Sequence, residues 1–331
     1  MKMNNNKLRQ AYKIIQEISN LAQLSDIELL SVFCDLKPTM GELINFDKYD
    51  QKFINKLNRV NELCKKIGFK FAVSRYKFIV NSPRGIFEMV DMDDKRKGKL
   101  SVGISKDIDI ALEGVELYYK KTLDSNDSRR FGEVMGYPKC CLDFGDYLCK
   151  NSKGEKERDP NNFGFANPAV ESLKRSKDFA WQLNVFTYSL LSYYPCSLTC
   201  VSSITSVNKI LNILSIVDPE KVSMIIDNLK NPASLYWTCV DKIFLYGDFK
   251  GDFKNSEIKY EKSDPKLNSI EFYQDNSSKF LNDLINVYRD IKKGNRLIMT
   301  PDYFEIYKDS KKISKIKKDN QYVPVLVKPN K

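Results

Sequence analysis

Four of the eight cysteines fall in two short motifs whose sulfur atoms could bind a metal. The first motif ends in the adjacent residues Cys140 and Cys141, and the second contains Cys196 and Cys200. The sequence has no histidine, which excludes imidazole metal ligands and every catalytic pair that depends on a histidine. Any metal site in this chain must therefore use sulfur or oxygen ligands.

Each cysteine pair follows a proline, Pro138 or Pro195. A proline can open a helix because its missing N–H would have no partner at the first helical position. The free N–H groups and the dipole of a first helical turn stabilise thiolates. We therefore expect both pairs to lie in the first turn of a helix, and we expect Cys196 and Cys200, four residues apart, to share one face of it.

The spacing of these cysteines bears on which metal they bind. One Zn²⁺ ion with bonds of about 2.3 Å needs thiolates about 3.8 Å apart, whereas adjacent residues on a helix diverge by about 100°. A 4Fe-4S cluster takes four thiolates on separate irons and accepts wider spacing. The sequence therefore predicts a 4Fe-4S cluster held by Cys140, Cys141, Cys196 and Cys200, with zinc as the alternative cofactor. A third interpretation is that the cysteines only pack as small apolar residues.

The two motifs resemble those of a family of prokaryotic domains of unknown function. They read Gly136-Tyr137-Pro138-x-Cys140-Cys141 and Pro195-Cys196-Ser197-x-x-Cys200, and the similar region covers about residues 129–203. A histidine often precedes the second motif in that family, whereas Tyr193 and Tyr194 stand there in this chain. The resemblance implies that the four cysteines act together, and it implies no particular reaction.

Without histidine, proton transfer near the motifs would use carboxylates, lysines, tyrosines or cysteines. Asp143 follows Cys140 by three residues on the same helical face, and Tyr137 belongs to the first motif, so these two are the candidate catalytic residues. We predict a metalloprotein, more often an enzyme than not, that acts in redox or sulfur chemistry on a small molecule. Its expected partner is a small-molecule substrate or an electron donor. The alternative is a zinc-stabilised nucleic-acid- or protein-binding module without catalysis.

The elements that must position these residues alternate between helical and strand patterns, which predicts an α+β fold. The helical centre carries the cysteines and has small mixed or antiparallel sheets on either side. The predicted parts are a helical segment 1–65, an α/β segment with short strands 66–124, a helical cysteine-motif domain 125–232, and an α+β module with a basic tail 233–331. Within the helical domain, apolar spacing over residues 179–190 predicts a helix.

The charge of the chain is concentrated at one end. The formal net charge is +11, and residues 308–331 carry eight lysines and two aspartates, a net charge of +6. Such a tail could contact nucleic acid weakly through phosphates, or it could be a solvated edge strand protected by lysines. The sequence offers neither a signal-peptide apolar core nor about 18 consecutive apolar residues, so we expect a cytoplasmic protein without membrane contact and with reduced thiols.

Overall fold

In the computed structural model the chain is described over residues 4–46, 48–80, 87–120, 125–151, 168–237, 241–252, 254–267, 279–318 and 325–329. It divides into two compact units, residues 1–151 with 205–222 and residues 152–204 with 223–331. Helices and two antiparallel sheets confirm the predicted α+β class. The predicted boundaries near residues 65, 124 and 232 stay a prediction.

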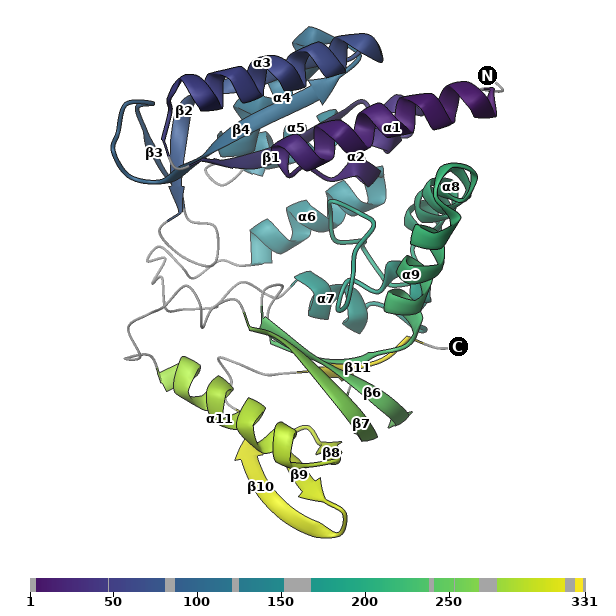
Figure 1. The fold of residues 1–331 in the computed structure, drawn as a ribbon. Helices are drawn as coiled ribbons and strands as arrows, with labels where there is room; N and C mark the ends of the chain where they lie inside the picture. The colour runs from purple at the N-terminus through teal and green to yellow at the C-terminus, as the bar shows by residue number, and fades with distance from the viewer. Residues whose placement is uncertain are drawn as a thin grey trace. The chain divides into compact units, whose positions relative to one another are not determined.

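The first unit contains a four-stranded antiparallel sheet with the order β1-β4-β2-β3 (Figure 1). Its strands are β1 (Thr39–Phe46), β2 (Lys70–Val80), β3 (Phe87–Val90) and β4 (Gly98–Ser105). Its helices are α1 (Asn5–Ala22), α2 (Asp26–Phe33), α3 (Gln51–Lys66), α4 (Ile108–Lys120), α5 (Ser125–Val134) and α6 (Lys139–Asn151), with most of α8 (Val201–Val217).

Helix α4 packs very closely on this sheet because the strand beneath it carries a glycine. A Cβ atom added to Gly103 on β4 would lie 2.2 Å from the carbonyl oxygen of Ala111 on α4. Val102 and Ile104 alternate with Gly103, so they point to the opposite face of the sheet, where both are fully buried. Both faces of the sheet are thus covered, which fixes the place of α4 and of the helix α5 that packs against it.

In the first unit, a cluster of polar side chains connects the C-terminal end of α8 to the N-terminal helices. The Tyr12 hydroxyl on α1 lies 2.9 Å from the Asp26 carboxylate and 3.4 Å from that of Asp218, which follows α8. Lys221 forms an ion pair with Asp26. Burial and the two carboxylates raise the pKa of Tyr12, which therefore stays a neutral hydrogen-bond donor.

The second unit is built on a seven-stranded antiparallel sheet with the order β10-β9-β8-β7-β6-β5-β11 (Figure 1). Its strands are β5 (Ala233–Tyr236), β6 (Asp241–Gly251), β7 (Ser256–Leu267), β8 (Arg296–Met299), β9 (Tyr303–Lys308), β10 (Lys311–Lys317) and β11 (Val325–Val327). The other elements are α7 (Pro168–Lys174), the 3₁₀ turn η1 (Trp181–Leu183), most of α9 (Pro219–Lys230) and α11 (Lys279–Lys293).

One face of this sheet forms the core of the second unit with α11. Val287 and Ile291 on α11 join the apolar side chains of β5 to β9 in a single buried cluster. The hydroxyl of Tyr260 on β7 donates a hydrogen bond of 2.8 Å to the Ile291 carbonyl oxygen. The side chains that alternate with this core point away from α11.

The predicted helix over residues 179–190 is wrong, since this stretch holds only the short turn η1 and irregular turns. Its apolar residues pack on the sheet instead, as Phe186 does against Tyr236 with ring centroids 5.0 Å apart. The Asn184 side chain donates to the Leu229 carbonyl oxygen at 2.7 Å. These tertiary contacts outweigh the helical spacing of the sequence.

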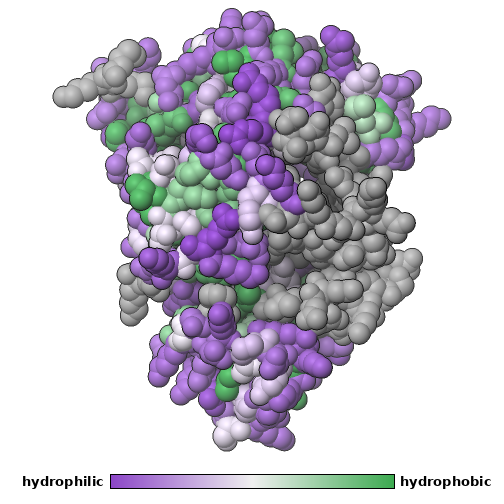
Figure 2. Space-filling view, turned by 180° about the vertical axis from the view of Figure 1, so that it is seen from behind, coloured by the Kyte–Doolittle hydropathy of each residue, from purple (hydrophilic) through white to green (hydrophobic). Residues whose placement is uncertain are grey.

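Among the described residues, none of the helices has both the length and the apolar character needed to cross a membrane. Hydrophilic residues cover much of the face shown in Figure 2, and the apolar residues on it occur in small groups.

Candidate metal centre

The structure brings the four motif cysteines together. The sulfur atoms of Cys140, Cys141, Cys196 and Cys200 all lie within 4.8 Å of one another. Within the adjacent pair, the Sγ atoms of Cys140 and Cys141 are 3.9 Å apart. Thiolates are ligands that soft and borderline metals prefer. This group of cysteines could therefore hold a metal ion.

The glycine of the first motif ends helix α5 and turns the chain. Gly136 has a φ of 75°, in the left-handed region that favours glycine. Its N–H donates to the Glu133 carbonyl oxygen at 3.0 Å, and the Tyr137 N–H donates to the Gly132 carbonyl oxygen at 2.9 Å. These two hydrogen bonds form a Schellman cap at the end of α5. A Cβ atom at Gly136 would also lie 2.7 Å from Cδ of Pro38.

The next two residues of the motif fix where helix α6 begins. The ring of Tyr137 packs edge-on against Phe131 of α5, with centroids 6.4 Å apart. The Pro138 carbonyl oxygen accepts hydrogen bonds from the N–H groups of Cys141 and Leu142, at 2.8 and 3.0 Å. Helix α6 begins at Lys139, so the prediction that this cysteine pair lies in a first helical turn is confirmed.

The second motif does not form the predicted helix. Helix α8 begins only at Val201, so Cys196 lies in an irregular segment and Cys200 directly precedes the helix. The Cys200 N–H donates to the Ser197 carbonyl oxygen at 3.1 Å, which closes a turn. The expectation that Cys196 and Cys200 share one helical face is therefore wrong, although their sulfur atoms meet at the same place.

A buried leucine explains why the chain turns between these two cysteines. Leu198 is fully buried. Its N–H donates to the Ser176 hydroxyl at 2.6 Å, and its carbonyl oxygen accepts from the Ala180 N–H at 3.0 Å. The N–H and carbonyl groups of Leu198 are thus engaged with Ser176 and Ala180 instead of making the bonds to Tyr194 and Ser202 that a helix through Cys196 and Cys200 would require.

A hydrogen bond reaches one of the sulfur atoms from α8. The hydroxyl of Ser203, which is fully buried, donates to Sγ of Cys200 at 3.3 Å. The Tyr193 hydroxyl lies 3.2 Å from the Ser203 oxygen, so Tyr193 can donate to it in turn. The sequence analysis missed Ser203. The only feature of the sequence that points to Ser203 is its position three residues after a cysteine at the start of a helix. That arrangement is common in sites without function.

The four cysteines differ in their access to solvent. Cys141 and Cys200 are buried, Cys196 is half-buried and Cys140 is exposed. Outside the site, burial raises the pKa of the Cys64 thiol to about 12 and that of the Cys34 thiol to about 11. Those two cysteines therefore remain protonated near neutral pH, as packing residues do.

The two candidate catalytic residues have structural partners. Hydrogen bonds from Lys139 and Arg129, at 2.8 and 3.1 Å, lower the pKa of Asp143 and hold it as a carboxylate. Arg129 also pairs with Asp146. Tyr137 packs against the buried cluster that includes Phe131, Val134 and Met135. A catalytic role for Asp143 or Tyr137 stays a prediction, and their observed contacts position the first motif.

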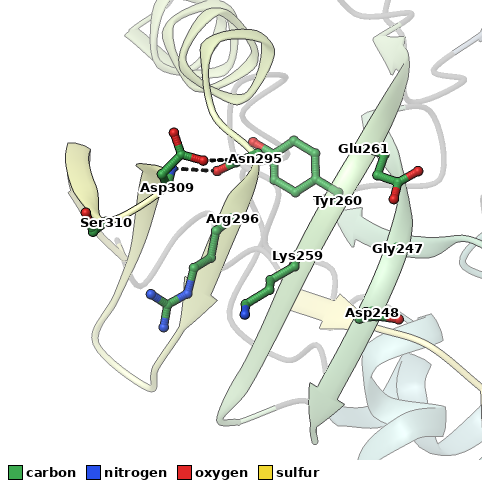
Figure 3. A pocket seen from close by; sticks show the side chains of 9 residues that line it. All are labelled: Gly247, Asp248, Lys259, Tyr260, Glu261, Asn295, Arg296, Asp309 and Ser310. Carbon is green, nitrogen blue, oxygen red and sulfur yellow. Dashed lines mark hydrogen bonds between the residues drawn. The ribbon is translucent and has the colours of Figure 1, made fainter.

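A separate cavity of about 550 Å³ lies in the second unit (Figure 3). Two cations, three carboxylates and several uncharged groups line it, namely Lys259, Arg296, Asp248, Glu261, Asp309, Gly247, Tyr260, Asn295 and Ser310. Hydrogen bonds of 2.8 Å join Asn295 and Asp309 at one end. The sequence analysis did not single out this cavity, because its residues come from separate strands and share no motif.

Comparison of the chain with protein-family models, with curated proteins and with solved structures gave no match. The resemblance of the two cysteine motifs to a prokaryotic family therefore stays a prediction.

Proposed function

We propose that this protein is a metalloprotein that binds one thiophilic metal ion, zinc, through Cys140, Cys141, Cys196 and Cys200. The observation that carries the proposal is the convergence of four sulfur atoms within 4.8 Å. A tetrahedral zinc site with bonds of about 2.3 Å places its thiolates about 3.8 Å apart. A group of sulfur atoms within 4.8 Å of one another is compatible with that spacing.

The adjacent cysteines favour a single ion over a cluster. The sequence analysis ranked zinc second because neighbouring residues diverge around a helix. In the structure, however, the sulfur atoms of Cys140 and Cys141 are 3.9 Å apart, close to the spacing that one zinc ion requires. A cluster spreads its thiolates over separate irons. The compact group thus supports zinc with four protein ligands, which is typical of a structural site.

The 4Fe-4S cluster, which the sequence favoured, is the second candidate because of the hydrogen bond from Ser203 to Cys200. Hydrogen bonds to cysteine sulfurs set the reduction potential of such clusters. The exposure of Cys140 would also give an electron donor or a small-molecule substrate access to one edge of the site. With a cluster, the protein would act in redox or sulfur chemistry.

Elemental analysis and an absorption spectrum of protein purified without oxygen test both candidates. We expect one zinc per chain and no visible absorption. Cys140→Ser should weaken zinc binding at least ten-fold, because one of four ligands is lost. Cys34→Ser, a matched change outside the site, should leave it unchanged. Iron and sulfide with visible absorption would assign the cluster instead, and a protein that binds neither metal would overturn the proposal.

A further inference from the structure

The face of the second sheet that points away from α11 carries cations beside aromatic rings. One row of cross-strand neighbours runs from β6 to β10 and consists of Asp248, Lys259, Arg296, Tyr307 and Lys312. All five alternate with core residues such as Ile258, Leu297 and Ile306, so they point away from the core. The row therefore presents three cations, one carboxylate and one tyrosine on this face.

The rings on this face are held beside cations. Arg296 lies over the ring of Tyr307, 5.3 Å from its centroid, and Lys315 lies 3.5 Å from the centroid of the Tyr303 ring. Both tyrosines are partly exposed. Glu305 fixes this arrangement, since it accepts hydrogen bonds from Lys312 at 2.7 Å and from the Tyr307 hydroxyl at 2.6 Å.

The charge of this face favours an anionic partner. On β7 to β10, the outward positions carry five cations, Lys259, Arg296, Lys312, Lys315 and Lys317, against the carboxylates Glu257 and Glu305, and Glu257 pairs with Arg296 at 2.7 Å. Sheets that bind single-stranded nucleic acid use this combination, in which bases stack on aromatic rings and cations contact the phosphates. A double helix would offer its phosphates but no free base faces to the rings.

The cavity in the same unit adds a recess to this surface. In Figure 3 the side chains of Lys259 and Arg296 project in the same direction from neighbouring strands. At about 550 Å³ the cavity is within the usual range of small-ligand sites, about 300 to 1,000 Å³. Its lining also includes the carboxylates Asp248, Glu261 and Asp309, and the Asn295 side chain is hydrogen-bonded to Asp309.

We propose that the outward face of strands β7 to β10 binds single-stranded nucleic acid. Tyr303 and Tyr307 stack bases, and Lys259, Arg296 and Lys315 contact phosphates. A base that stacks on Tyr303 displaces Lys315 from the ring, and the lysine then pairs with the adjacent phosphate. This exchange is favourable because base stacking exceeds an exposed cation–π contact. The proposal is independent of the metal centre.

Fluorescence anisotropy of the full chain with labelled twelve-nucleotide dT and U strands tests this proposal. Three phosphate contacts should make the affinity fall about 20-fold between 50 and 200 mM salt. The double variant Lys259→Gln with Lys315→Gln should bind about ten-fold more weakly and should lower the salt slope by about two-thirds. The matched double variant Lys48→Gln with Lys52→Gln, which neutralises two exposed lysines of the first unit, should bind normally.

The tyrosines separate this proposal from a general attraction to polyanions. Tyr303→Leu should weaken binding about five- to 100-fold while leaving the salt slope unchanged, because it removes stacking and no charge. The circular dichroism spectrum of each variant should match that of the unchanged protein. Binding that is equally tight to a duplex, to an acidic peptide or to anionic vesicles, or that is insensitive to Tyr303→Leu, would overturn the proposal, as would no binding at 50 mM salt.

Discussion

The cysteines of the proposed metal centre differ in exposure, and the buried Cys200 accepts a hydrogen bond from Ser203. A donor to a thiolate stabilises its charge, so the Ser203 hydroxyl favours the form of Cys200 that binds metal. Tyr193 holds Ser203 in turn. We infer that both residues position and tune a ligand without touching the metal.

Ser203→Ala should therefore weaken zinc binding about ten-fold, because groups that support a ligand typically contribute that much to affinity. Competition with a chromogenic chelator measures this loss. The neighbouring Ser202 is exposed, so Ser202→Ala serves as the matched control. Tyr193→Phe should give a smaller loss. If Ser203→Ala binds zinc as tightly as the control, the hydrogen bond has no role in the site.

Cys64 illustrates the opposite environment, since burial raises the pKa of its thiol from 9.0 to about 12. The unfolded thiol loses its proton at lower pH than the folded one, so the free energy of unfolding should fall as the pH rises above about 9. Between pH 8 and pH 10, the free energy of unfolding of the unchanged protein should fall by about 1.4 kcal/mol more than that of the Cys64→Ala variant. Urea unfolding at the two pH values checks this, and equal losses would contradict it.

At the scale of elements, the cysteines depend on how helices begin and end. The turn between α5 and α6 requires glycine at position 136 for two reasons. Gly136 has a positive φ, and a Cβ atom there would collide with Pro38. The same turn places Cys140 and Cys141 in the first turn of α6. The glycine, tyrosine and proline of the motif are thus explained by chain geometry alone.

Gly136→Ala should destabilise the protein by about 2 kcal/mol or more, because alanine disfavours the left-handed conformation and its Cβ would meet Pro38. It should also lower the zinc content by moving the first cysteine pair. The control is Gly145→Ala within α6, where a Cβ meets nothing within 4 Å. That change should stabilise the helix by about 0.5 to 1 kcal/mol. Urea unfolding and zinc analysis measure both effects, and equal behaviour of the two variants would refute this account of the motif.

The two motifs also show how far the sequence could predict the site. The first motif was predicted correctly, because a proline and its helix are neighbours in the chain. The second was not, because the turn at Leu198 depends on Ser176 and Ala180, about 20 residues away. The convergence of the sulfur atoms could be inferred from residue types alone. The hydrogen bond from Ser203 could not, since it requires the actual path of residues 193–203.

At the scale of the whole molecule, part of the net charge of +11 lies on one edge of the second sheet. Lys312, Lys315 and Lys317 of the predicted basic tail lie on the edge strand β10, which is one of the two interpretations that the sequence allowed. Lysines on an edge strand discourage pairing with other chains. The adjacent tyrosines have no part in that protection, which is why their removal tests nucleic-acid binding.

Metal removal should affect the stability of the whole protein, because a ligand that binds only the folded state stabilises it by mass action. Zinc at about 1,000 times its dissociation constant should raise the free energy of unfolding by about 4 kcal/mol. Differential scanning calorimetry of chelator-stripped and zinc-loaded protein, both kept reduced, measures this shift. Cys140→Ser should show a much smaller shift, whereas Cys34→Ser should behave like the unchanged chain. If stripped and loaded protein melt at the same temperature, the four cysteines do not form a stabilising zinc site.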